Sequence, residues 1–174
     1  FAITIVLVIG SIVVFKQLDY VRTTDTGLDR DQVITIATQD PELWDRFETL
    51  EQELLKNPSI QEISSSQFQP TRMSSRTSLT DWDELEEGEE FNIYISPVGF
   101  NFTEMLGIEV IAGRTFSKEL QQETSTDYLI NEATLRELGW TANEALGKTF
   151  APWGSTGTIV GVVKDFNFLS LYQD

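Results

Sequence analysis

The first fifteen residues carry no charged side chain, and within FAITIVLVIGSIVVF only Thr4 and Ser11 are polar. Both residue types are tolerated in lipid-spanning helices. A complete span needs about 20 apolar residues, so the pattern favours the C-terminal end of a transmembrane helix over residues 1–16. Two alternatives stay open. One is a signal peptide, although no basic segment or cleavage site is visible, and the other is a core element.

Residues 17–32 form a polar connector between this apolar segment and the rest of the chain. Residues 16–32 contain three basic residues (Lys16, Arg22 and Arg30) and four aspartates. This flank therefore lacks the excess of Lys and Arg that cytoplasmic loops favour. We therefore interpret residues 17–32 as a stalk outside the cytoplasm.

Alternating and periodic apolar positions predict a β-α-β unit over residues 33–68. Residues 33–37 are β-branched and typical of a strand. Asp40 and Pro41 suit a helix N-terminus, and Leu43, Phe47, Leu50 and Leu54 would share one helix face. Pro58 would end the helix, and residues 60–68 are then expected to form a second strand.

The C-terminal half alternates short strand and helix patterns. Asn131 suits a helix N-cap, Thr141 and Glu144 match a capping box, and Gly139 and Gly147 suit helix ends. The predicted strands cover residues 91–96, 108–112, 128–130 and 158–163, and the predicted helices cover 100–106, 132–138 and 142–146. The expected fold is α+β. It has a mixed sheet with the β-α-β unit, a domain over residues 33–171, and a second small α/β subdomain over about 113–163.

The composition restricts the catalytic and metal-binding chemistry open to this protein, because the chain contains no His and no Cys. This excludes Ser-His-Asp and Cys-His catalysis and the usual zinc, haem and iron–sulfur ligand sets. Carboxylate acid/base chemistry and an oxygen-ligated calcium or magnesium site remain possible. The formal charge of −16 would repel nucleic acid. We single out no catalytic, cofactor-binding or metal-binding residue and expect no cofactor.

Residues 81–90 read DWDELEEGEE and carry seven carboxylates. Charges this dense usually form a solvated loop or hairpin tip. A calcium site and an electrostatic docking patch stay open, although the spacing does not match an EF-hand loop.

Glycines and tryptophans are assigned structural roles. We expect glycines to supply turns and close packing, and three tryptophans to lie in the core or at a subdomain interface. The glycines are Gly107, Gly113, Gly139, Gly147 and Gly161, and the tryptophans are Trp44, Trp140 and Trp153.

Three segments, taken in order, resemble the periplasmic domain of MacB/FtsX-type ABC-transporter permeases, especially the second such domain of the long permeases of Bacteroidota-like bacteria. The first is FKQLDYVRTTDTGLDRDQVITI at residues 15–36, and the second is FNFTEMLGIEVIAGRTFS at 100–117. The third is LINEATLRELGWTANEALGKTF at 129–150 together with TIVGVVKDFNFLSLYQD at 158–174. The sequence departs from the pattern at Asn167, where many relatives carry His.

The resemblance implies a bacterial inner-membrane permease domain on the periplasmic side that is not itself an enzyme. A cytoplasmic ATPase and a second permease copy or half would be its partners, with an adaptor or lipoprotein substrate possible. ATP-driven motion would pass through the stalk, residues 15–32, and the return segment, residues 164–174, for export or extraction of lipoproteins, peptides or amphiphiles. A membrane-anchored extracytoplasmic binding or sensor domain is the alternative, and a carboxylate glycosidase is a distant third.

Overall fold

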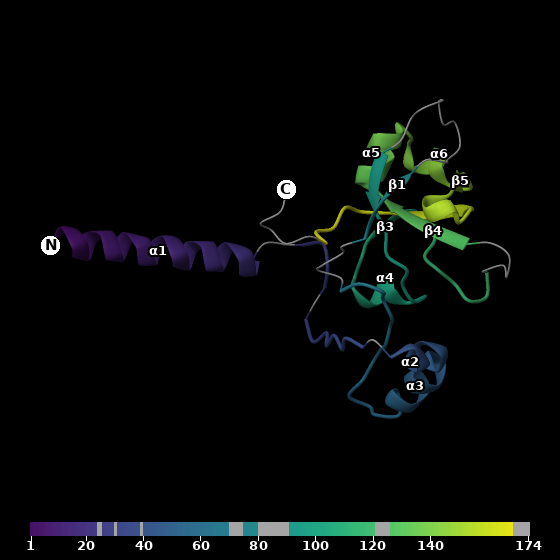
Figure 1. Cartoon of the computed structure of the whole chain (residues 1–174), viewed down its shortest axis with the longest axis horizontal. Coiled ribbons are helices and arrows are strands. Elements are labelled where there is room, and N and C mark those ends of the chain that lie inside the picture. The colour runs from purple at the N-terminus through teal and green to yellow at the C-terminus, as the bar shows by residue number, and fades with distance from the viewer. Residues whose placement is uncertain are drawn as a thin grey trace.

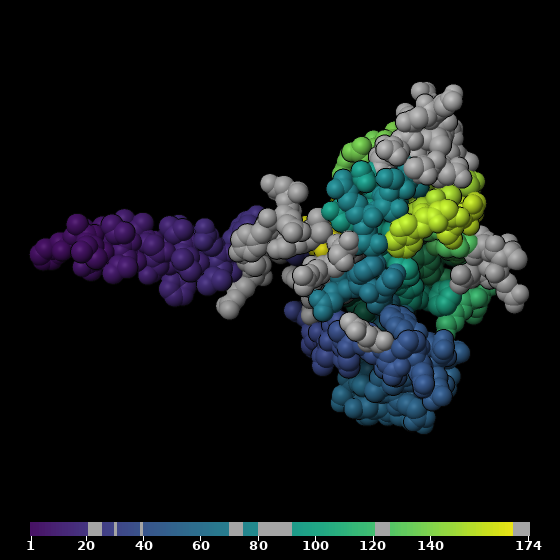
Figure 2. Space-filling view, viewed as in Figure 1, coloured from purple at the N-terminus to yellow at the C-terminus, as the bar shows by residue number. Residues whose placement is uncertain are grey.

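An apolar helix projects from an α+β body (Figure 1). The computed structural model describes residues 1–23, 26–29, 31–38, 40–69, 75–79, 91–120 and 126–168. Helix α1 (Ala2–Thr23) is exposed over residues 2–20, and its segment Ala2–Tyr20 is long and apolar enough to cross a membrane. Figure 2 shows it as a rod that stands clear of the body.

The larger sheet is built around β6 (Gly157–Val163), which lies between β3 (Val110–Gly113) and β4 (Thr126–Asn131). Strand β6 pairs antiparallel with β3 and parallel with β4, and β5 (Thr149–Phe150) pairs with it antiparallel. A parallel neighbour needs a crossover connection, which α5 (Glu132–Leu138) and α6 (Ala142–Ala145) supply. The mixed sheet and the α+β class are as predicted.

Two apolar clusters hold the body together. In the first, Ile159 and Val162 of β6 and Leu79 of the smaller sheet are fully buried, and Ile93 of the smaller sheet is 8% exposed. That sheet consists of β1 (Arg76–Leu79) and β2 (Phe91–Tyr94) in antiparallel pairing. The second cluster gathers around α4 (Phe102–Met105) and contains Leu28, Phe102, Leu106, Ile108 and Val163.

The helix caps of the C-terminal half are confirmed. The Asn131 side chain accepts a hydrogen bond from the Thr134 amide at 3.1 Å, and α5 ends at Gly139 with φ of 70°. At the start of α6, the amide and the hydroxyl of Thr141 both donate to Glu144 Oε2, at 2.9 and 2.6 Å. These local signals sit where the sequence predicts them because capping needs only neighbouring residues.

The β-α-β unit predicted at residues 33–68 is absent from that region. Residues 33–38 form no strand, and among residues 60–68 the structure has only an isolated bridge between Ser66 and Val98. Ile34 and Ile36 are 86% and 81% exposed. The β-branched pattern gives strand propensity, but a strand also needs a partner, and no strand in the described part of the chain pairs with this segment. The parallel β-α-β connection lies at β4–β6 instead.

The helix predicted after Asp40 forms, but in two pieces. Helix α2 (Pro41–Asp45) begins with the Glu42 amide donating to Asp40 Oδ1 at 3.0 Å, and α3 (Phe47–Leu54) follows after a break at Arg46. No residue of either helix is buried. Figure 2 shows this segment as a lobe at one side of the body.

Two tryptophan assignments are wrong. Trp44 and Trp153 are 47% and 50% exposed, whereas Trp140 packs against the first cluster as predicted. The Lys148 ammonium lies 4.6 Å from the centre of the Trp140 ring.

Strand β1 was not predicted, because its sequence is rich in Ser, Thr and Arg and only Leu79 is buried. The acidic segment, residues 81–90, lies outside the described residues.

The same substitution, Ile to Ala, can compare the buried core of β6 with the exposed segment at residues 33–38. Ile159→Ala removes a fully buried side chain and is expected to lower the free energy of unfolding by about 2–5 kcal/mol. Ile36→Ala changes an exposed side chain and should stay within about 0.5 kcal/mol. Denaturant unfolding of the full chain in mild detergent, followed by Trp fluorescence, measures both. An equal loss for the two variants would mean that residues 33–38 pack in solution.

The α6 capping box predicts a pH dependence. The hydrogen bonds from the Thr141 hydroxyl and amide lower the pKa of Glu144 below its usual 4.5. A lowered folded-state pKa gives a stabilising contribution that is present above pH 4.5 and is lost as the pH falls through the folded-state pKa. Glu144→Gln keeps a capping side chain but cannot titrate, so its stability deficit relative to the parent should shrink on acidification. Equal deficits at neutral and at strongly acidic pH would contradict this assignment.

Candidate functional site

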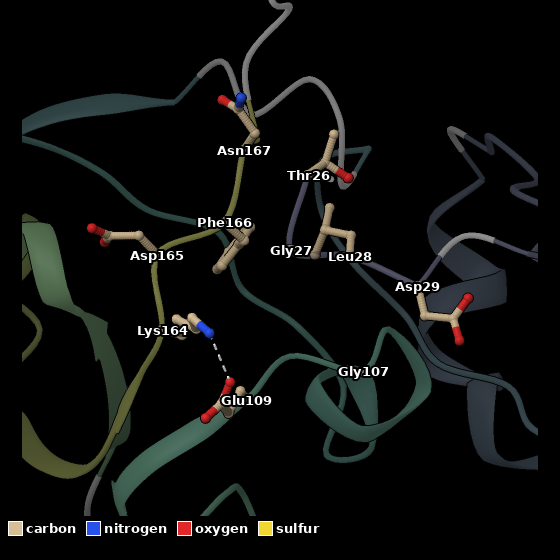
Figure 3. A pocket seen from close by; sticks show the side chains of 10 residues that line it. All are labelled: Thr26, Gly27, Leu28, Asp29, Gly107, Glu109, Lys164, Asp165, Phe166 and Asn167. Atoms are coloured by element: carbon tan, nitrogen blue, oxygen red, sulfur yellow. Dashed lines mark hydrogen bonds and ion pairs between the residues drawn. The ribbon is translucent and has the colours of Figure 1, made fainter. Parts of the chain in front are cut away.

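The chain leaving α1 meets the chain leaving β6 at a single place, which we call the junction (residues 26–29 and 164–167; Figure 3). The Asn167 amide donates a hydrogen bond to the Thr26 carbonyl at 2.7 Å. A cavity of about 640 Å³ lies between the two segments and the turn at Gly107. The two segments predicted as stalk and return segment therefore lie side by side.

The stalk side of the junction is anchored in the second apolar cluster. Leu28 is 8% exposed and packs there, and the Asp29 amide donates to the Leu106 carbonyl at 2.7 Å. Gly27 has φ of 71°, and a Cβ at that position would lie 3.1 Å from both the Asp165 carbonyl oxygen and Phe166 Cβ. Only glycine allows this backbone conformation and this close approach without strain.

Asp165 fastens the return segment to the start of α5. Its Oδ1 accepts hydrogen bonds from the Asn131 side-chain amide and from the Ala133 backbone amide, both at 2.8 Å. Its Oδ2 accepts from the Arg136 guanidinium at 2.7 Å, and its own amide donates to Glu132 Oε2 at 3.1 Å. The carboxylate thus supplements the Asn131 cap at the positive end of the helix dipole.

Charges around the junction support this arrangement. The hydrogen bond to Asp165, together with the attraction between the two charges, raises the pKa of Arg136 above its usual value. Lys164 pairs with Glu109 at 3.0 Å, as the dashed line in Figure 3 marks, and both side chains are exposed. Figure 3 shows the Asp165 side chain pointing away from Gly27 and Leu28, while Phe166 turns into the space between the segments.

Asp165 lies in the segment KDFNF, residues 164–168, which belongs to the sequence resemblance, but it is not among the predicted functional residues. The signal was available: a residue that follows β6 lies at the same sheet edge as the residue that follows its parallel neighbour β4. Asn131 and the start of α5 follow β4 directly. What the sequence could not supply was the parallel pairing itself, which joins residues about thirty positions apart.

The other sequence-based assignments map onto this site only in part. Asn167 takes part through its backbone. Of the predicted stalk, residues 17–23 continue helix α1. Gly107 has φ of 62°, and a Cβ there would lie 3.2 Å from Asp29 Cβ, so it serves as the expected turn. Across the described ranges, no cluster of three or more acidic side chains is arranged to hold a metal ion.

Similar solved structures exist, although no family model and no curated protein matches the sequence. The periplasmic region of MacB from Actinobacillus actinomycetemcomitans aligns with a TM-score of 0.49 at 17% identity, covering 70% of this chain and 52% of that one. A domain of a putative permease protein from Porphyromonas gingivalis aligns with a TM-score of 0.37 at 26% identity, covering 63% and 48%.

The chain spans about half the length of each of these two structures. About half of either structure therefore has no counterpart in this chain.

The contribution of the Asp165 hydrogen bonds to stability can be compared with that of the exposed ion pair between Lys164 and Glu109. Asp165→Asn removes the charge from a group that accepts three hydrogen bonds and should lower the free energy of unfolding by about 1–3 kcal/mol. Glu109→Gln breaks the exposed pair with Lys164 and should cost less than about 1 kcal/mol. Hydrogen exchange of the peptide covering residues 164–168 should accelerate more in the first variant. Equal exchange in the two variants would show that Asp165 does not fix the return segment.

Proposed function

We propose that this chain is the extracytoplasmic domain of an ABC-transporter permease and relays ATP-driven movement of membrane helices. Support begins with α1, whose segment Ala2–Tyr20 has the length and composition of a membrane span. A helix whose large apolar side chains are this exposed needs an apolar surrounding, and a bilayer supplies one. The body would therefore be held at the membrane by this helix.

The single observation that carries the proposal is the junction. The chain enters the body at residues 26–29 and leaves it at residues 164–167, and the two segments are joined by the hydrogen bond from Asn167 to Thr26. A domain inserted between two membrane helices needs its entrance and exit at one end. A domain tethered only at its N-terminus has no such requirement. Figure 1 shows the yellow return segment running back toward the end of α1.

The body is suited to transmit displacement without deforming. On the return side, Asp165 connects the exit to α5, and β6 connects it to the middle of the larger sheet. On the stalk side, Leu28 connects the entrance to the second cluster. Packed elements transmit displacement because a close-packed interior is not continuously deformable. Movement of either tether would therefore move the whole body.

The assignment of the motion to ATP-driven transport rests on the sequence resemblance to MacB/FtsX-type permeases. In that setting a cytoplasmic ATPase would drive the cycle, a second permease copy or half would face this one, and an adaptor or lipoprotein would be a further partner. The domain itself would perform no chemistry and would sit on the periplasmic side of the bacterial inner membrane. A tethered sensor remains the second candidate.

Membrane sidedness is tested with a single cysteine, because the chain has none of its own. Asn143 on α6 is exposed, so Asn143→Cys in the membrane parent, otherwise free of cysteine, presents one reactive thiol. An impermeant maleimide should label intact cells as completely as lysed cells. Labelling that appears only after lysis would place the body in the cytoplasm and end the transport proposal.

A second arm of this test separates permease from sensor. A flexible Gly-Ser insert after Phe168 lengthens the return segment, and the same insert after Ser59 lengthens the exposed turn that follows α3 as a matched control. In a permease, the first insert should uncouple transport from ATP hydrolysis, while the second should leave coupling intact. A sensor with one tether would tolerate both inserts equally.

A further inference from the structure

A second cavity, of about 600 Å³, lies between β2 and β4; we call it the intersheet cavity. Its volume falls within the range of about 300–1,000 Å³ typical of small-molecule sites. Aromatic and aliphatic side chains supply most of its wall. The aromatic ones include Phe100, Phe102, Tyr128, Phe150, Trp153 and Phe168.

The charges of the wall select the ligand. Among the described residues that line the intersheet cavity there is no Lys or Arg, whereas Asp127 and Glu137 bring two carboxylates. Asp127 is already paired with Arg114 at 2.7 Å, and Glu137 is exposed. The whole chain adds a formal charge of −16. An anionic headgroup would be repelled here, and a cationic one attracted.

Trp153 lines this cavity and has an unusual backbone conformation. It has φ of 55° and ψ of 20°, in the left-handed region that bulky side chains avoid, and its side chain remains half exposed. Pro152 before it is buried and fixes the turn, so the strained conformation is imposed by the fold. Strain of this kind concentrates at binding sites, and an indole face attracts a cationic group.

We propose that the intersheet cavity binds a cationic amphiphile with a single alkyl chain. The alkyl chain lies among the phenylalanine side chains, and the headgroup lies at Trp153 and Glu137. An alkyl chain makes no hydrogen bonds, so it matches a wall that is mostly carbon. A peptide would bring amide groups into the same space, and each would need a partner. The site would exist in a permease or in a tethered sensor alike.

The return segment is part of the cavity wall. Phe166 and Phe168 line the intersheet cavity, and the Phe168 ring lies 5.2 Å from the Tyr94 ring of β2, measured between ring centres. Binding and docking of the return segment are therefore linked, and each must change the other's free energy by the same amount. Interpreting this link as the loading of a transported amphiphile rests on the proposed function. The binding site itself does not rest on it.

The test uses the full chain in nanodiscs of phosphatidylcholine. The probe is a hexadecyltrimethylammonium analogue with a photoreactive diazirine at the end of its alkyl chain, and crosslinked peptides are mapped by mass spectrometry. Crosslinks are expected within residues 92–102 and 126–134, which line the cavity. Unlabelled hexadecyltrimethylammonium should compete, and hexadecanoate should not.

Two tryptophans of equal exposure give a matched pair of variants. Trp153→Ala should reduce crosslinking at the cavity about tenfold, because it removes both apolar contact and the cation–π partner. Trp44→Ala changes a Trp on α2 that does not line the cavity and should leave crosslinking unchanged. If Trp153→Ala fails to fold, Val98→Trp fills the cavity from its wall, with Ile111→Trp on β3 as its control.

Three results would overturn the site. Crosslinks confined to α1 would show that the probe only partitions into the bilayer. Equal competition by hexadecanoate would remove the charge selectivity. Displacement of the probe by an apolar peptide but not by the unlabelled amphiphile would assign the cavity to peptides. None of these results bears on the maleimide labelling of Asn143→Cys, so the two proposals fail separately.

Discussion

The parallel pairing of β6 with β4 is the constraint on which the rest of the body depends. Strand β6 lies between two neighbours, and Ile159 and Val162 within it are fully buried. Space on this strand is so limited that a Cβ at Gly161 would collide with the Arg114 backbone, and one at Gly157 with the Thr126 backbone. The two glycines let the flanking chains approach β6 closely, and the positions of the surface features depend on this arrangement of the sheet.

The junction is a consequence of that pairing. Since β4 and β6 run in the same direction, the chain that leaves β6 arrives beside the N-terminus of α5, which follows β4. A carboxylate at that point meets amide donors that have no partner within the helix, and Asp165 accepts from one of them at 2.8 Å. The return segment is thereby directed across Gly27, where the absence of a side chain leaves room for it. Entrance and exit are brought together by backbone geometry more than by surface charge.

The sequence predicts best what adjacent residues decide. The boundaries of α5, its Asn131 cap and the Thr141–Glu144 capping box depend on contacts within four positions, and all were found. Residues 33–37 carry the same kind of local signal but form no strand, because strand formation depends on a partner far along the chain. The Asp165 network and the intersheet cavity join residues from β2, β4 and β6, and no local pattern encodes them. The exposure of Trp153 was not predicted, because the size of its side chain suggested burial, whereas its turn leaves the side chain half exposed.

A body that transmits force and a body that holds a ligand place opposite demands on packing, and both demands meet at the first apolar cluster. Around the middle of β6 this cluster is close-packed, and Ile159 and Val162 are fully buried there and do not line the intersheet cavity. At its edge, Ile93, Ile130 and Phe150 of the same cluster form part of the cavity wall. Phe166 and Phe168 of the return segment complete that wall, so the position of the exit is sensitive to what fills the cavity, while the close-packed part of β6 keeps the two tethers connected.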